Sequence, residues 1–315
     1  MDARAVEESV RVKSRAPGRR VARLLVVLLS IGVGAYAGSL TVVDPAAHYP
    51  EGPTWRKGQL YYVEYSANNI KRWDGTHISV FWHRDGCGPS GLIAFGEDWL
   101  VACYDDNSVV ELDAAGQQIR ATRVDNRGAP FAGPNDFSSD GHGGIYFSAS
   151  GTYDVGAPIS GAVLHMSSDG KTVIVVANTV HYPNGLTMSR DGAHLLVAEM
   201  LAGRVLAFPI LPGGNLGPRS VWARLRDIAA STPGEDAYNG PDGLKLGPDG
   251  NYYIAQNGSG RVLVVSENKK LVRTIDVPTP FVTNLAFDSD GAVFVTGVFD
   301  EWKSPYGGGV YRWQP

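Results

Sequence analysis

The sequence of 315 residues predicts an all-β protein, a six-bladed β-propeller preceded by an N-terminal signal or anchor segment. It contains 39 Gly and 19 Pro, a content that favours many short strands and tight turns. After the N-terminal segment, no long run of apolar residues shows helical spacing. Instead, one pattern recurs six times from residue 51 onward, in units of roughly 36 to 58 residues, as expected for propeller blades.

The N-terminal segment has the features of a signal peptide. Six basic residues between Arg11 and Arg23 precede an uncharged apolar run at 24–37, and Ala35-Tyr36-Ala37 has the form of a cleavage site. About 14 apolar residues is short for a bilayer span of about 20. We therefore expect residues 1–37 to direct export to the periplasm or beyond, and 38–315 to form the propeller domain. The alternative is an uncleaved anchor that holds the body outside the cytoplasm and is its only membrane contact.

Each repeat contains apolar runs separated by turns. Asp-Gly turns such as 190–192 and 248–250 lie between apolar segments, which is typical of β-hairpins. The units begin near Pro53, Pro89, Pro134, Pro183, Pro241 and Thr283. The second runs are 60–63, 99–102, 145–147, 194–198, 251–255 and 292–295, and the third runs include 108–112, 161–166, 204–208, 261–265 and 309–313. Closure of the ring requires residues 40–43 to add a strand to the last blade.

Four oxygen-bearing residues stand at the start of first runs. They are Glu51, Asn135, Asn184 and Asp242, each next to or within a turn that contains Pro or Gly. In a propeller the innermost strand of each blade lines the central channel, so these side chains would ring one mouth of it. Alone, each could be an ordinary turn residue, since Asn and Asp are common in turns. Their coincidence at equivalent positions predicts a shared site.

Two carboxylates and two amide oxygens form a hard donor set without thiolate or imidazole. Such a set suits Ca²⁺ first, with Mg²⁺, Mn²⁺ or Zn²⁺ as alternatives. The charges of Glu51 and Asp242 would balance one divalent cation, and water and substrate would complete its coordination. An open site of this kind can polarise a bound carbonyl as a Lewis acid.

Other residues are candidates for substrate contact or for support of the ligands. The second strands should end at the same mouth, which gives a second ring of Glu64, Tyr104, Ser148, Glu199 and Gln256. Asp136 follows a predicted ligand directly. His181 could move protons near the channel, although a surface or hydrogen-bonded histidine is the alternative. The long insertions 149–160 and 226–239 are candidate substrate-selecting loops.

Composition and motifs exclude several functions. The net charge of −4 gives no reason to expect nucleic acid as a partner. Residues 86–91 match G-x-G-x-x-G, but no βαβ unit surrounds them, and no G-x-S-x-G elbow occurs. The two cysteines, Cys87 and Cys103, allow one disulfide in an oxidising compartment or two buried free thiols.

The motifs Glu51-Gly-Pro, Gly-Pro-Asn135-Asp-Phe, Pro-Asn184-Gly-Leu and Gly-Pro-Asp242-Gly-Leu resemble those of the senescence marker protein (regucalcin) and gluconolactonase family. The stretch 143–186 resembles most its bacterial drug-responsive lactonase branch. The resemblance implies a six-bladed propeller with one divalent metal, usually calcium. It also implies that Glu51, Asn184 and Asp242 are ligands, that Asn135 binds metal or substrate, and that Asp242 is the base. Gly133 replaces the arginine of sugar-lactone members, which argues against a gluconolactone-type substrate.

The sequence thus predicts an exported, metal-dependent lactone hydrolase. Its expected partner is a small-molecule lactone, and a monomer is expected. One alternative is a phosphotriesterase-like hydrolase on the same fold. The other is a noncatalytic extracellular binding propeller, since fold alone does not determine function.

Overall fold

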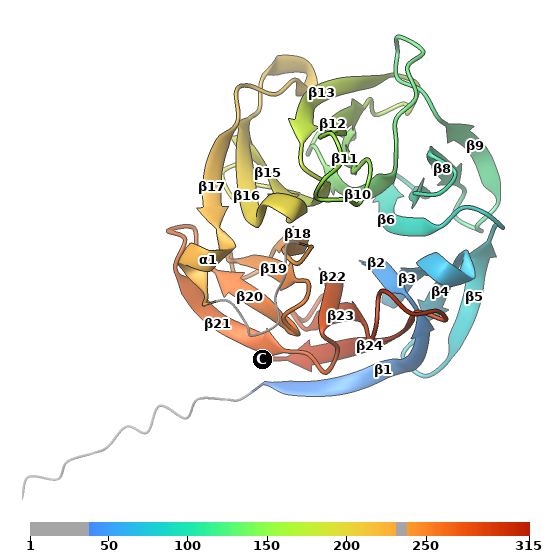
Figure 1. Cartoon of the computed structure of the whole chain (residues 1–315). Coiled ribbons are helices and arrows are strands. Elements are labelled where there is room, and N and C mark those ends of the chain that lie inside the picture. The colour runs from blue at the N-terminus through green and yellow to red at the C-terminus, as the bar shows by residue number, and fades with distance from the viewer. Residues whose placement is uncertain (1–37, 231–237) are drawn as a thin grey trace, which may run out of the picture. The chain divides into compact units, whose positions relative to one another are not determined.

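The computed structural model describes residues 38–230 and 238–315, which form a six-bladed β-propeller of four-stranded antiparallel sheets (Figure 1). The predicted signal or anchor at 1–37 lies outside the described residues, as does 231–237 of the second predicted loop. No helix in the described part of the chain is long and apolar enough to cross a bilayer. The predicted fold class is confirmed.

The blades follow one another in chain order. Blade 1 holds β2 (Pro50–Arg56), β3 (Gln59–Glu64), β4 (Asn69–Trp73) and β5 (Ile78–His83). Blade 2 holds β6 (Pro89–Phe95), β7 (Asp98–Cys103), β8 (Ser108–Leu112) and β9 (Gln118–Thr122). Blade 3 holds β10 (Pro134–Ser139), β11 (Ile145–Ala149), β12 (Gly161–Met166) and β13 (Val173–Val180). Blade 4 holds β14 (Pro183–Met188), β15 (His194–Glu199), β16 (Arg204–Pro209) and β17 (Ser220–Arg224).

Blade 5 holds β18 (Pro241–Leu246), β19 (Tyr252–Gln256), β20 (Arg261–Val265) and β21 (Leu271–Asp276). Blade 6 holds β22 (Phe281–Phe287), β23 (Val293–Val298), β24 (Gly307–Gln314) and β1 (Ser39–His48). The described residues also form the short helix α1 (Leu225–Ile228) and 3₁₀ turns at Tyr65–Ala67, Met200–Ala202 and Pro212–Gly214. Each predicted second and third run overlaps one strand, with ends that differ by a few residues at most.

The ring closes through β1, as predicted. Strand β1 pairs antiparallel with β24, with Leu40 opposite Trp313. The junction with blade 1 is polar, because the backbone N–H of His48 donates to Glu64 Oε1 over 2.8 Å. Lys71 Nζ lies 2.9 Å from Glu64 and 3.1 Å from Asp44, which joins β1 to blade 1 by charge. The first strand of the propeller therefore fastens its last blade to its first.

The hydrophobic core consists of six clusters, one between each pair of neighbouring blades. Because side chains alternate along a strand, one strand serves two clusters. In β7, Trp99 and Val101 pack toward blade 1, whereas Leu100 and Ala102 pack toward blade 3. Burial on both faces explains why the second runs read as nearly continuous apolar segments. This packing holds the six innermost strands in a fixed ring.

Candidate active site

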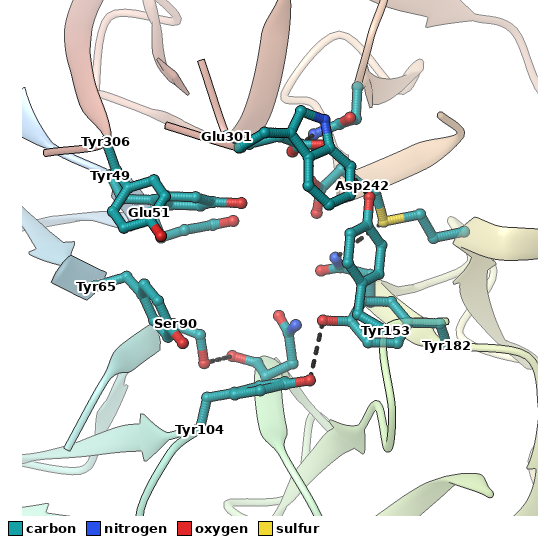
Figure 2. Close-up of a pocket in the computed structure, with 15 residues that line it drawn as sticks. Tyr49, Glu51, Tyr65, Ser90, Tyr104, Tyr153, Tyr182, Asp242, Glu301 and Tyr306 are labelled. Atoms are coloured by element: carbon teal, nitrogen blue, oxygen red, sulfur yellow. Dashed lines mark hydrogen bonds between the residues drawn. The ribbon is translucent and has the colours of Figure 1, made fainter. Parts of the chain in front are cut away.

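A cavity of about 350 Å³ lies where the innermost strands of the blades begin. All four predicted ligands line it, and Figure 2 shows Glu51 and Asp242 projecting into it. Glu51, Asn135, Asn184 and Asp242 are each the second residue of an innermost strand. Ser90, the second residue of β6, also lines the cavity, and its hydroxyl donates to the Pro134 carbonyl over 3.0 Å. The structure therefore brings the predicted set together.

A local irregularity of the backbone aims these side chains inward. Each innermost strand loses register with its neighbour at its start, for example between Glu51 and Thr54 and between Pro241 and Leu244. A β-bulge at this point bends the strand and redirects one side chain. The same shift occurs in all six blades, so the repeated turn motif in the sequence encodes a repeated bulge.

Glycine after the ligand lets neighbouring blades approach closely. A Cβ atom at Gly185 would collide with the backbone of Leu244 in blade 5, and one at Gly243 would collide with Asn284 in blade 6. The crowding explains the Asn184-Gly and Asp242-Gly pairs as packing requirements of the channel. It also keeps the ligand side chains of adjacent blades near one another.

Blades 3 and 6 carry Asp136 and Asn284 where four other blades carry glycine. These two side chains meet in the channel, where Asn284 Nδ2 donates to Asp136 Oδ2 over 3.3 Å. Lys245 Nζ lies 2.7 Å from the same oxygen. Of the two roles predicted for Asp136, substrate contact or support of the ligands, its position favours support, because it is not among the described residues that line the cavity. We refer to Asp136, Lys245 and Asn284 as the channel floor.

The two carboxylates of the site favour their protonated forms in the absence of a cation. Burial raises the pKa of Asp242 well above its usual range, and the charges of Glu51 and Glu301 raise it further. Burial also raises the pKa of Glu51, although a hydrogen bond from the Gly52 N–H opposes this shift. The cavity thus gathers several carboxyl groups, and no Lys, Arg or His is among the described residues that line it.

Unpartnered oxygens provide a test of whether a metal fits. The side-chain Oδ1 atoms of Asn135, Asn184 and Asp242 are buried and have no hydrogen-bond partner among the described residues. Buried polar atoms are normally paired, so three such oxygens around one cavity fit the donor set of a cation. Within residues 38–230 and 238–315 no three His, Cys, Asp or Glu side chains gather as a metal site. The two amide oxygens are therefore needed to complete the donor set, which fits calcium.

The predicted second ring is only partly present. Tyr104 lines the cavity, whereas Glu64, Ser148, Glu199 and Gln256 do not. In three blades the lining residue is the next one along the chain, namely Tyr65, Met200 and Asn257. Because successive side chains point to opposite faces, an error of one residue in these three blades selects a side chain that points away from the cavity.

The residues of this second set that miss the cavity have other partners. Ser148 Oγ accepts a hydrogen bond from the Asp136 N–H over 3.0 Å and so supports the channel floor. Glu199 accepts from the backbone N–H of His181 over 2.9 Å and pairs with Arg204. His181 does not line the cavity, and its buried Nε2 has no partner among the described residues.

Asn257 and Glu301 line the cavity beside Asp242 but were not among the predicted site residues. Asn257 Nδ2 lies 3.4 Å from Asp242 Oδ2 and 3.5 Å from Glu301 Oε2, so one amide links both carboxylates. Glu301 lies in the loop between β23 and β24 and lines the cavity. The correct register of the second strands would have revealed Asn257. No repeat position marks Glu301, because the loop is specific to blade 6.

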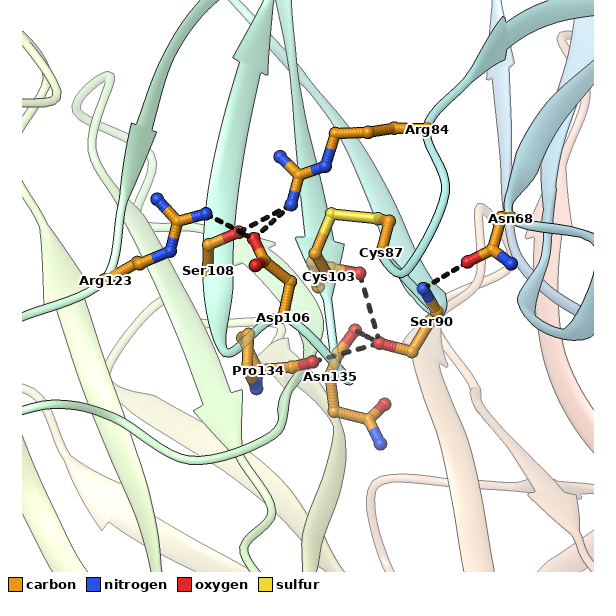
Figure 3. The surroundings of a disulfide bond; sticks show 12 residues. Asn68, Arg84, Cys87, Ser90, Cys103, Asp106, Ser108, Arg123, Pro134 and Asn135 are labelled. Carbon is orange, nitrogen blue, oxygen red and sulfur yellow. Dashed lines mark hydrogen bonds and ion pairs between the residues drawn. A yellow bond between two sulfur atoms is a disulfide. The ribbon is translucent and has the colours of Figure 1, made fainter.

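A disulfide joins Cys87 and Cys103, with a Cα–Cα distance of 4.6 Å (Figure 3). Cys87 lies just before β6, which carries Ser90, and Cys103 directly precedes Tyr104. The bond therefore links two segments that both supply side chains to the cavity. Of the two possibilities left open by the sequence, the structure forms the disulfide.

Comparisons with known proteins agree with this architecture. The family model described as the SMP-30/gluconolactonase/LRE-like region matches residues 49–299. The chain is 26% identical over 261 residues to pentonolactonase XacC of Haloferax volcanii, and the match covers 78% of this chain and 79% of that protein. It is 28% identical over 146 residues to lactonase drp35 of Staphylococcus aureus, covering 46% of this chain and 42% of that protein.

Among solved structures, regucalcin of Agrobacterium tumefaciens, described as a calcium-binding protein, superposes with a TM-score of 0.71. The identity is 19%, and the match covers 87% of this chain and 93% of the other, which shows a shared fold. The resemblance of the four turn motifs is confirmed by the family match. This chain belongs to the SMP-30/gluconolactonase/LRE-like family, a group that includes lactone hydrolases.

Proposed function

We propose that the protein hydrolyses lactones at the cavity with one divalent cation, calcium first, held by Glu51, Asn135, Asn184 and Asp242. The observation that carries this proposal is the group of three buried, unpartnered oxygens on Asn135, Asn184 and Asp242, in the same cavity as the carboxylate of Glu51. The relatives named as lactonases and the calcium-binding description of a structural neighbour support the same assignment. When bound, the cation would supply a Lewis acid for the carbonyl oxygen and lower the pKa of water.

The side chains of the cavity have distinct tasks in this reaction. Asn257 donates a hydrogen bond to Oδ2 of Asp242 and so orients this side chain. The other oxygen, Oδ1, has no hydrogen-bond partner among the described residues and is available to the cation. Asp242 would position the attacking water and accept its proton, because a cation beside this carboxylate favours the ionised form that a general base needs. The water oxygen would form a bond to the lactone carbonyl carbon, the ring C–O bond would break, and the ring oxygen would take the proton that Asp242 accepted from water.

A chelation experiment tests the proposal. The purified protein would be assayed on γ- and δ-lactones and on a phosphotriester, after treatment with EDTA and after addition of Ca²⁺, Mg²⁺, Mn²⁺ or Zn²⁺. We expect lactone hydrolysis that EDTA abolishes and calcium restores. Hydrolysis that resists chelation would refute the metal role. Preference for the phosphotriester would favour the alternative hydrolase, and stoichiometric metal without turnover would favour a binding protein.

We also propose that the protein is exported and acts as a monomer. The basic and apolar pattern of residues 1–37 supports export, and a disulfide is typical of an oxidising compartment. Fractionation of cells that express the full chain would test this. Recovery of the whole protein from the cytoplasm, with Cys87 and Cys103 open to alkylation before reduction, would contradict it.

A further inference from the structure

Aromatic side chains surround the upper part of the cavity. Seven aromatic residues are among its described lining, and we call six of them the aromatic collar: Tyr49, Tyr65, Tyr104, Tyr153, Tyr182 and Trp302. The seventh, Tyr306, contacts Tyr49 with a centroid distance of 6.1 Å. The rings of the collar contact one another along the wall, with centroid distances of 5.4 Å for Tyr49–Tyr65 and 4.8 Å for Tyr153–Tyr182. The hydroxyls of Tyr104 and Tyr182 lie 3.2 Å apart and connect the part of the wall with Tyr65 to the part with Tyr153 (Figure 2). The collar is thus a nearly continuous aromatic wall.

The hydroxyl hydrogens of the collar are largely used within the protein. Tyr65 donates to Asp105 over 2.8 Å, Tyr104 donates to the Gly151 carbonyl over 2.8 Å, and Tyr182 donates to Tyr104. Tyr153 donates to the carbonyl of Tyr238 over 3.2 Å. A sugar-derived lactone needs donors and acceptors for several hydroxyl groups, since unpaired polar groups are costly to bury. The collar offers ring faces and edges in their place.

The charge of the cavity restricts its ligand further. The charged residues among its described lining are all acidic, namely Glu51, Asp242 and Glu301, and this lining contains no Lys, Arg or His. A cation held by Glu51 and Asp242 would leave Glu301 as the charge nearest to the collar. An anionic substrate would have no partner there and would meet a carboxylate. The ligand expected from these charges is neutral.

We propose that the cavity selects neutral lactones that carry a flat apolar ring over polyhydroxylated lactones, an inference that rests on the lactone hydrolysis proposed above. A volume of about 350 Å³ is at the small end of the range for ligand sites and suits a bicyclic molecule. Aromatic rings favour stacked or edge-to-face contacts with another ring. The collar would bind the flat ring, and the lactone carbonyl would lie deeper, near Asp242.

Trp302 is the collar residue best suited to a test. Its side chain is 60% exposed, so its removal leaves the core intact. Its ring stacks with that of Tyr153 at 6.1 Å and an interplanar angle of 18°. Phe299 provides a matched control, because it lies in the same loop and is 47% exposed but does not line the cavity.

Three six-membered lactones separate ring binding from chemical reactivity. In 3-isochromanone the lactone is fused to a benzene ring but still releases an alkyl alkoxide, as δ-valerolactone does. D-glucono-1,5-lactone presents the same ring size with hydroxyl groups. With the metal-loaded protein we expect kcat/KM for 3-isochromanone to exceed that for δ-valerolactone by about tenfold, on the basis of two aromatic contacts. Gluconolactone should be the poorest substrate.

The variants determine whether the collar is responsible. Trp302→Ala should raise KM for 3-isochromanone about 3- to 10-fold and change KM for δ-valerolactone less than about twofold, whereas Phe299→Ala should change neither. A preference for gluconolactone, or equal effects of Trp302→Ala on all three lactones, would overturn the proposal while leaving lactone hydrolysis in place.

A titration without turnover makes the two proposals separable. Isochroman, which lacks the carbonyl, should bind at least about tenfold more tightly than tetrahydropyran in calorimetry, and Trp302→Ala should remove most of this difference. If no lactone is hydrolysed but isochroman still binds in this way, the proposed function fails and the ligand preference stands. Equal affinity for the two ethers refutes the preference itself.

Discussion

Replacing Glu51 by Gln should stabilise the metal-free protein at alkaline pH. Burial and the charge of Asp136 raise the pKa of Glu51 from 4.5 to about 8. The folded protein therefore holds a proton in a pH range where the unfolded chain has already released it. The stability of the metal-free protein must then fall as pH rises from about 4.5 to about 8. The amide introduced by Glu51→Gln carries no charge and would not contribute to this fall.

The expected gain in Tm can be calculated from the shift in the pKa of Glu51. A change from 4.5 to about 8 corresponds to at most ~5 kcal/mol, because one pKa unit is worth about 1.4 kcal/mol. Water and side-chain movement reduce such values, so roughly 2–3 kcal/mol is a conservative expectation. For a domain of this size each kcal/mol shifts Tm by about 2–4 °C. We expect Glu51→Gln to raise Tm by about 5–10 °C at pH 8 in EDTA.

The difference in Tm between wild type and Glu51→Gln can be measured by calorimetry at about pH 5 and pH 8, in EDTA and in excess Ca²⁺. The difference should shrink at the lower pH, where folded Glu51 is protonated, and calcium should stabilise wild type far more than the variant. Glu97→Gln is the control, since this exposed carboxylate pairs with Lys57 at the surface and should change Tm little. A variant that melts below wild type in EDTA at the higher pH, or a gain that persists undiminished at the lower one, would refute the electrostatic reasoning.

Three further outcomes test other features of the site. Asp242→Asn should lower kcat for a lactone by about 10²-fold or more with an unchanged circular dichroism spectrum, whereas unchanged turnover would exclude Asp242 as the base. The double variant Cys87→Ser, Cys103→Ser should unfold about 2–4 kcal/mol more easily in urea, because the disulfide closes a sequence separation of 16 residues, and an unaltered midpoint would contradict this. Gly185→Ala should destabilise the fold by about 1–3 kcal/mol through collision with Leu244, which a thermal melt would detect, and an undiminished Tm would show that the channel can relax.

The fold could be predicted from the sequence because its signal is repeated. Asp-Gly turns, apolar runs and the turn motifs recur along the chain, so an uncertain boundary in one blade is corrected by the others. The same repetition placed Glu51 and Asp242 correctly at one mouth, since equivalent strand positions must meet around a ring. The pairing of residues 40–43 with the last blade followed from closure alone.

The parts that could not be predicted depend on single residues or single loops. The second ring required a register accurate to one residue, and the turn motifs do not specify where the second strands end. That uncertainty separates Glu64 from Tyr65 and Gln256 from Asn257. Glu301 and Trp302 belong to a loop present in one blade, so no repeat could reveal them. The collar arises from residues scattered between 49 and 302 that only the closed ring brings together.

The channel floor has a consequence for how substrate would enter the site and product would leave it. A second cavity, bordered by Lys245, lies beyond the floor and shares no described lining residue with the first. If lactones are opened in the first cavity, the hydroxy acid has to leave by the mouth through which its precursor came. Substrate and product would therefore use the same opening and the same cavity, which predicts competitive product inhibition. The newly formed carboxylate leaves past Glu301, whose negative charge would repel the product and hasten its release.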